Sequence, residues 1–134
     1  MSRRVPDRVS DVFNRIRHAT QLKRHSVRMP RTTLTVDVLR VLLNEGYVSG
    51  VRVLGEPPRQ ECEVFLKYND MDQSVIRTIR RISKPSRRII VSARQLIPSR
   101  GGLGRFILST NLGVISDAEA RKLNVGGEVL GEVF

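Results

Sequence analysis

The spacing of apolar residues changes near the middle of this 134-residue chain, and this change limits the fold that the chain can adopt. In the first half, apolar residues recur at helical spacing over 9–16 and again over 34–42. Asp7 is placed to cap the first helix, Thr32 or Thr33 the second, and Gly46 to end it. Short strands are expected around 27–29, at 48–54 and at 62–68. The first half therefore predicts helix–strand–helix–strand–strand.

The second half has turn signals and short apolar runs instead of long helical stripes. The expected strands are 75–82, 88–91, 105–110 and 128–134, with a helical turn at 92–96 and a glycine-rich bend at 101–104. Ser116 and Glu119 have the spacing of a capping box, which predicts a short helix over 117–122. The whole pattern predicts an α+β fold of two small domains. An α/β N-terminal domain would cover 1–70 and a mainly β C-terminal domain 71–134, with the boundary at 69–73.

Composition limits the core and the compartment. The chain has no Trp and only six other aromatic residues, so its hydrophobic cores should be small and aliphatic. Cys62 is the one cysteine, which excludes an intrachain disulfide. No apolar run is long enough to span a membrane. The N-terminal 28 residues are rich in Arg, as in a transit peptide, but they contain the first expected helix, so we interpret them mainly as part of the fold.

Positive charge is concentrated in two blocks. Residues 1–40 carry a net charge of +7, residues 41–73 carry −3, and residues 74–134 carry +7. Residues 73–116 contain nine Arg or Lys residues and no acid. Of the 24 basic residues 20 are Arg, whose planar guanidinium binds phosphate and also stacks on bases. Two basic surfaces separated by an acidic one predict two contacts with one polyanionic partner, and RNA is favoured over a membrane surface.

Residues suited to catalysis are scarce. His18, His25 and Cys62 show no metal-ligand spacing. The GGLGRF segment lacks the third glycine of a dinucleotide fingerprint and precedes a strand rather than a helix, and no phosphate-binding loop motif is present. No base accompanies Ser109 as it would a nucleophile. We therefore expect no enzyme activity, no cofactor, no metal and no small-molecule substrate.

A hydroxyl- and amide-bearing segment follows the basic run. Ser109, Thr110 and Asn111 end an apolar strand, and Gly113 comes next. Short side chains that both donate and accept hydrogen bonds suit the 2′-hydroxyls and base edges of an RNA minor groove. The same residues also favour an ordinary turn, which is the simpler interpretation of the segment alone. The adjacent basic run favours RNA recognition, and Gly126 and Gly127 could bring main-chain amides to the same surface.

The segment GRFILSTNLGVISDAEAR (104–121) closely resembles the signature of small-subunit ribosomal protein family eight. The resemblance continues through GGEVLGEVF at 126–134, DVFNRIRHA at 11–19, VRMPRTTLTVDVLRVLLNEGYVSGV at 27–51 and RISKPSRRI at 81–89. It covers the chain from about Pro6 onward, in the family's order. It implies an α/β N-terminal domain, a mainly β C-terminal domain, and binding to an irregular stem in the central domain of small-subunit rRNA, beside neighbouring small-subunit proteins.

The resemblance also implies an RNA-binding set from both domains. In that family the Ser-Thr-x-x-Gly loop contacts RNA, a Gly-Gly-Glu segment supports it, a basic turn and strand lie alongside, and the start of the second helix adds a contact. The matching residues here are Ser109, Thr110, Gly113, Gly126, Gly127, Glu128, Arg87, Arg88, Arg94, Arg31 and Thr32. Asn111 replaces the family's usual third hydroxyl, Ser86 a frequent glycine, His18 a common Asn, and Ile90 a frequent aromatic residue.

Two functions and several compartments stay open. The first function is a structural rRNA-binding constituent of the small ribosomal subunit that supports its assembly and translation. The alternative is a free RNA-binding translational regulator, and sedimentation with the small subunit separates the two. The departures and the high Arg content favour a mitochondrial ribosome over bacterial cytoplasm or a plastid. In that case we expect the protein to be organelle-encoded or imported through an uncleaved signal.

Overall fold

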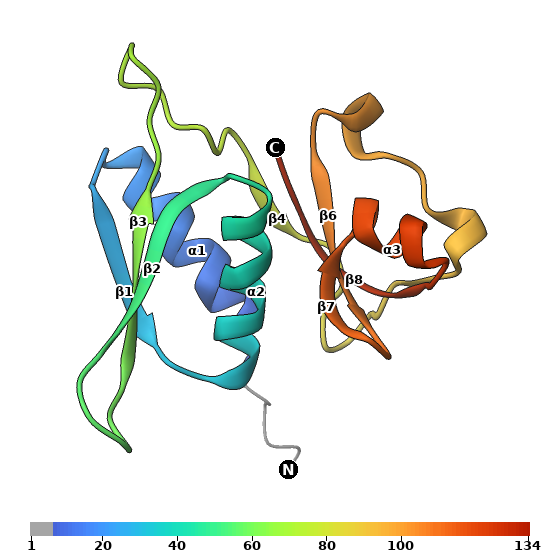
Figure 1. The fold of residues 1–134 in the computed structure, drawn as a ribbon, viewed down its shortest axis with the longest axis horizontal. Helices are drawn as coiled ribbons and strands as arrows, with labels where there is room; N and C mark the ends of the chain where they lie inside the picture. The colour runs from blue at the N-terminus through green and yellow to red at the C-terminus, as the bar shows by residue number, and fades with distance from the viewer. Residues whose placement is uncertain (1–6) are drawn as a thin grey trace.

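A computed structural model describes residues 7–134, and Figure 1 shows helices and strands in two lobes. The helices are α1 (Arg8–Gln21), α2 (Thr33–Asn44) and α3 (Asp117–Leu123). The strands are β1 (Ser26–Pro30), β2 (Val48–Leu54), β3 (Glu61–Leu66), β4 (Ile79–Arg81), β5 (Ile90–Val91), β6 (Arg105–Thr110), β7 (Gly113–Ser116) and β8 (Gly127–Val133). All strand pairs are antiparallel, so the predicted α+β class is confirmed.

The N-terminal lobe packs α1 and α2 against a three-stranded sheet of order β1-β3-β2. Asp7 caps α1 by accepting a hydrogen bond from the Ser10 amide at 3.1 Å. Thr32 caps α2 in the same way, with 3.1 Å between its hydroxyl and the Thr35 amide nitrogen. Both helices begin where the sequence predicts, because each has a side chain that satisfies a free amide of the first turn.

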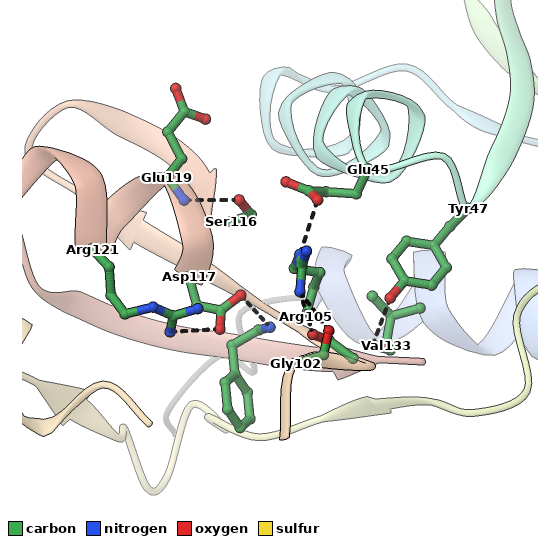
Figure 2. Close-up of polar contacts among 11 residues, drawn as sticks. Glu45, Tyr47, Gly102, Arg105, Ser116, Asp117, Glu119, Arg121 and Val133 are labelled. Carbon is green, nitrogen blue, oxygen red and sulfur yellow. Dashed lines mark hydrogen bonds and ion pairs between the residues drawn. The ribbon is translucent and has the colours of Figure 1, made fainter. Parts of the chain in front are cut away.

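The C-terminal lobe is built around β8. The sheet order is β4-β8-β6-β7, and β5 also pairs with β8. The predicted strand at 105–110 is confirmed as β6, and the predicted short helix is confirmed as α3. Ser116 caps α3 by accepting from the Glu119 amide at 3.2 Å. Asp117 is fully buried and accepts hydrogen bonds from the Phe106 amide at 3.1 Å and from Arg121 at 2.8 Å (Figure 2).

Two hydrophobic cores lie on opposite faces of this five-stranded sheet. Ile107 of β6 joins the larger core, which also contains the buried residues of α1, α2 and the first sheet. Its neighbour Leu108 joins the smaller core, together with Ala120 of α3 and Val129 of β8. Adjacent residues of a strand face opposite sides, so one strand contributes to both cores. The larger core is therefore shared by residues from both lobes.

Polar contacts also join the lobes. Arg105 of β6 forms an ion pair with Glu45, just after α2, at 3.0 Å (Figure 2). The Tyr47 hydroxyl donates to the Val133 carbonyl at 3.4 Å, and Asp7 pairs with Arg81 of β4 at 3.2 Å. Because the larger core and these contacts cross from one half of the chain to the other, the two-domain division at residues 69–73 stays a prediction.

Two strand predictions need correction, and one strand was not predicted. The expected strand at 75–82 is only Ile79–Arg81, because the amides of Arg77 and Thr78 both donate to the Phe134 carbonyl, at 2.7 and 2.8 Å, and no regular ladder continues. The expected strand at 88–91 is only Ile90–Val91, since the amide of Ile89 bonds the Ser83 hydroxyl at 2.8 Å. Strand β7 was not predicted. The residues before it indicated only a turn, although β6 and β7 form the two strands of a hairpin.

Candidate RNA interface

The predicted C-terminal site residues meet at one end of the five-stranded sheet. Ser109 of β6 lies opposite Val114 on one side and Glu128 of β8 on the other. Ile90 of β5 also lies opposite Glu128. Residues that lie opposite one another in a sheet present their side chains to the same face. We call the region formed by Arg88, Ser109–Gly113 and Gly126–Glu128 the sheet-end surface.

The turn between β6 and β7 is closed by Thr110. Its hydroxyl donates to the Gly113 carbonyl at 2.9 Å and accepts from the Leu112 amide at 3.1 Å. Asn111, at the tip of the turn, is exposed. Gly113 has φ of +111°, and a Cβ placed on it would meet no atom within 4 Å. The turn is therefore shaped by Thr110, and it leaves open space beside Gly113.

The hydroxyl of Ser109 differs from that of its neighbour. Ser109 is half-buried, and within residues 7–134 its hydroxyl has no hydrogen-bond partner. A hydroxyl can donate one hydrogen bond and accept two. The Ser109 hydroxyl is therefore the member of the Ser-Thr pair that is available to an outside ligand, whereas that of Thr110 is already used by the turn.

The glycines at the start of β8 allow close packing of main chains. A Cβ on Gly127 would overlap the carbonyl oxygen of Ser109, and a Cβ on Gly126 would overlap that of Val91. Any side chain at these positions would push β8 away from β6 or from β5. The two glycines thus allow β8 to lie close to β6 and β5, and this packing supports the main chain at Ser109.

Arg88 and Glu128 form a two-point ion pair across this surface. The guanidinium nitrogens of Arg88 lie 2.9 and 3.2 Å from the two carboxylate oxygens of Glu128. The hydrogen bonds from Arg88 lower the pKa of Glu128 below its ordinary value, against the opposing effect of burial. The Arg88 side chain stays 64% exposed, while that of Glu128 is 15% exposed. Glu128 therefore orients Arg88 and offsets its charge.

Two further predicted cations have no such acid. Arg87 lies at the end of a tight turn, where its main chain exchanges hydrogen bonds with Lys84 at 2.9 Å. Arg94 lies in the 3-10 turn Ala93–Gln95. Both side chains are exposed, and neither forms an ion pair with another residue of 7–134. They flank the sheet-end surface with uncompensated positive charge.

Arg31 and Thr32 lie in the other lobe, at the start of α2. The Thr32 hydroxyl is occupied in capping, since it accepts from the Thr35 amide and donates to the Thr35 hydroxyl at 2.8 Å. Arg31 is exposed. Figure 1 shows the start of α2 and the β6–β7 turn at the same lower end of the molecule. The structure does not bring this pair into contact with the sheet-end surface.

Two exposed apolar side chains lie at this end of the sheet, a placement that was not predicted for either of them. Ile90 is 67% exposed and shares the face of Ser109 and Glu128, and Leu112 at the turn is 57% exposed. An aliphatic side chain at position 90 offers no aromatic ring for base stacking. The partners of Ile90 are distant in sequence, so no local pattern could place it beside Ser109.

The arrangement suits recognition of a ligand. Among residues 7–134 no group of three or more His, Cys, Asp or Glu side chains is placed to hold a metal ion. In the same range no helix is both long and apolar enough to cross a membrane. The sheet-end surface combines a free hydroxyl, an oriented guanidinium and unobstructed space, which together suit a polar, anionic ligand of some length.

Comparison with known proteins gives a consistent result. The family model of ribosomal protein S8 matches residues 7–134. The chain is 47% identical over 133 residues to the small ribosomal subunit protein uS8 of Sphingopyxis alaskensis, covering 97% of this chain and 98% of that protein. It is 40% identical over 137 residues to the uS8 protein of Thermus thermophilus, with 97% and 99% coverage. The uS8 protein of Caulobacter vibrioides is 46% identical over 129 residues, with 96% and 97% coverage.

Proposed function

This chain belongs to the ribosomal protein S8 family, a family of structural, non-enzymatic ribosomal proteins, and on that premise we propose that it binds small-subunit rRNA through the sheet-end surface. The observation that carries this proposal is the hydroxyl of Ser109, which has no hydrogen-bond partner in the described range 7–134. Ser109 lies opposite Glu128, which orients Arg88, and the turn that follows Ser109 leaves open space at Gly113. A hydroxyl in that setting can bond a 2′-hydroxyl or a base edge, which distinguishes RNA from DNA.

The other residues of the interface have separate tasks. Arg87 and Arg94 bind phosphates and supply affinity that does not depend on sequence. Arg88, held by Glu128, makes an oriented contact. Gly126 and Gly127 keep the main chain of β8 against that of β6 and β5, so the position of Ser109 is fixed before binding. Thr110 keeps the turn closed, and Arg31 adds a contact from the other lobe.

The finer parts of the proposal follow from family resemblance. The RNA target would be an irregular stem in the central domain of small-subunit rRNA. The neighbours would be other small-subunit proteins, and the binding step would support assembly of the subunit. The relatives described above are bacterial proteins. The mitochondrial location rests on the Arg-rich composition and stays a prediction, which fractionation of organelle and cytosolic ribosomes would decide.

The test of this proposal is Ser109→Ala, which removes a hydroxyl with almost no change in size. We expect the variant to bind its rRNA stem more weakly by about 1–3 kcal/mol, because the partner group on the RNA is left unpaired. Affinity for an unrelated RNA at the same salt concentration should hardly change. Filter binding of both RNAs, with folding checked by circular dichroism, measures the ratio.

Ser49→Ala is the matched control, since Ser49 is an exposed serine of β2 whose hydroxyl bonds the Phe65 carbonyl. It should leave both affinities unchanged. If Ser109→Ala weakens both RNAs equally, or neither, RNA selection does not occur at this hydroxyl.

A further inference from the structure

The buried carboxylate of Asp117 continues the β6–β7 ladder beyond the point where the main-chain pairing ends. The last main-chain pair at the base of this hairpin is formed by Ile107 and Ser116. At Asp117 the chain turns into α3, so no residue of β7 lies opposite Phe106. The side chain of Asp117 takes that place, because one of its oxygens accepts a hydrogen bond from the Phe106 amide at 3.1 Å (Figure 2).

The second oxygen of Asp117 is held by Arg121, one turn further along α3. The Nη1 of Arg121 lies 2.8 Å from this oxygen, and the Asp117 side chain is fully buried. Replacing a buried ion pair by apolar residues often costs no stability, so stability alone does not account for a buried carboxylate. Its distinctive contribution is geometric, because it fixes the first turn of α3 to the base of β6.

Side chains thus close the β6–β7 hairpin at both ends. Thr110 closes the turn, where its hydroxyl donates to the Gly113 carbonyl, and Asp117 closes the base. Ser109 lies between these two closures, opposite Val114 of β7. A strand that slips by one residue turns each of its side chains to the opposite face. The two closures therefore keep the Ser109 side chain on the face that carries the sheet-end surface.

We propose that Asp117 is a positioning residue for RNA recognition, which holds β6 so that the Ser109 hydroxyl meets its partner on the RNA. This inference rests on the proposed function. Asp117 is buried and does not itself touch RNA. A contact that depends on one hydroxyl needs placement to within about 0.5 Å, which supporting residues provide. Loss of the Asp117 contacts should therefore weaken selection of the rRNA stem more than it weakens general RNA affinity.

Asp117→Asn tests the proposal with almost no change in shape. The Asn side chain has one oxygen in place of two, so its NH2 group faces a donor at either Phe106 or Arg121. We expect the preference for the rRNA stem over an unrelated RNA to fall about threefold to tenfold at fixed salt. Affinity for the unrelated RNA should hardly change. Filter binding measures both affinities, and faster hydrogen exchange of the 106–110 amides would show that the base of β6 has loosened.

A double-mutant cycle distinguishes positioning from a general loss of stability. If Asp117 acts through Ser109, adding Asp117→Asn to Ser109→Ala should lower the preference no further. Glu63→Gln is the matched control, since Glu63 is also a buried acid that is paired with arginine, in β3 of the other sheet. It should leave the preference unchanged even where it lowers the melting temperature.

A compensating change at Arg121 provides a rescue. In Asp117→Asn/Arg121→Gln, the Asn oxygen accepts from the Phe106 amide and its NH2 group donates to the Gln oxygen, as amide pairs four residues apart on a helix do. The net charge equals that of the wild type, and the preference should return most of the way. Arg121→Gln alone keeps a donor beside Asp117 and should lower the preference less. It continues the test if Asp117→Asn does not fold.

The outcomes separate the two proposals. If Ser109→Ala lowers the preference but Asp117→Asn and Arg121→Gln do not, the inference is wrong and the proposed function stands. The inference is also wrong if the losses from Ser109→Ala and Asp117→Asn add in full, or if Glu63→Gln lowers the preference as much as Asp117→Asn does. If Ser109→Ala leaves the preference unchanged, the proposed function fails and the inference fails with it.

Discussion

Arginine has different partners in two regions of the molecule. One is the joint between the lobes, which includes the Arg105–Glu45 and Asp7–Arg81 pairs and the packing of Phe13 on Gly131. The other is the sheet-end surface. At the joint, Arg105 pairs with Glu45 and donates to the carbonyls of Gly102 and Gly104 at 3.1 and 3.0 Å. Arg17 of α1 donates to the Ile79 carbonyl of β4. Around the sheet-end surface, Arg87 and Arg94 have no acid within residues 7–134. Charge counted along the sequence therefore does not distinguish arginines that join the lobes from arginines that are available to a ligand; their internal partners do.

The largest expected effect tests whether the joint is needed for folding. In Gly131→Ala, the new Cβ would overlap the ring of Phe13 and lie 2.7 Å from the Arg80 carbonyl oxygen. Helix α1 or strand β4 would have to move away from β8. We expect the free energy of unfolding to fall by about 2–4 kcal/mol, measured by urea denaturation.

Gly50→Ala is the matched control for this variant. It also lies in a strand, but its Cβ would meet only the Phe65 ring, at an ordinary 3.6 Å. It should change stability by less than about 1 kcal/mol. Equal stability of Gly131→Ala and wild type would show that the joint tolerates separation of the lobes.

A smaller effect concerns the charge at the joint. Burial tends to raise the pKa of Asp7, but its hydrogen bonds with Ser10 and its pairing with Arg81 lower it below the ordinary value of 3.8. Because the folded pKa is depressed, the stabilisation is complete above that ordinary value and is lost as pH falls through the folded pKa. Asp7→Asn can still cap α1 but loses the charge.

We expect Asp7→Asn to be less stable than wild type by about 1 kcal/mol at neutral pH. The difference should disappear in acid, where wild-type Asp7 is protonated. Thermal unfolding from pH 7 down to pH 2 measures it. A difference that is independent of pH would assign the effect to capping alone.

The smallest expected effect concerns the sheet-end surface. Glu128→Gln leaves Arg88 without its acid, so Arg88 can reach phosphates of any RNA. We expect affinity for unrelated RNA to rise a few-fold and its salt slope to steepen by about 0.7–0.9. The preference for the rRNA stem should fall, because Arg88 is no longer oriented.

Glu56→Gln makes the same charge change at an exposed acid of the loop between β2 and β3, and Glu56 has no ion-pair partner in the described chain. It separates the loss of Arg88's partner from a general change in net charge. If both variants shift RNA affinity alike, the Arg88–Glu128 pair has no special role in recognition.

Local signals in the sequence were sufficient for much of the fold. Asp7 and Thr32 predicted both N-terminal helices because a cap and the helix it starts are neighbours in sequence. Strand β6 was predicted with its observed bounds. The site was harder to predict from the sequence than the fold. Arg88 and Glu128 are 40 residues apart, so their pairing depends on the register of β5 and β8. Sequence also could not distinguish the free hydroxyl of Ser109 from the occupied one of Thr110, because that difference arises from turn geometry.

The position of β8 in the sheet has a consequence for biosynthesis. This strand lies at the centre of the five-stranded sheet, yet it follows every other strand in chain order. During translation, β4, β5, β6 and β7 emerge from the ribosome before the strand that pairs with β4, β5 and β6. Until residues 127–133 emerge, these strands have unpaired edges and both cores lack residues of β8. Nascent chains stalled before this point should therefore be more prone to aggregation and proteolysis than the finished protein.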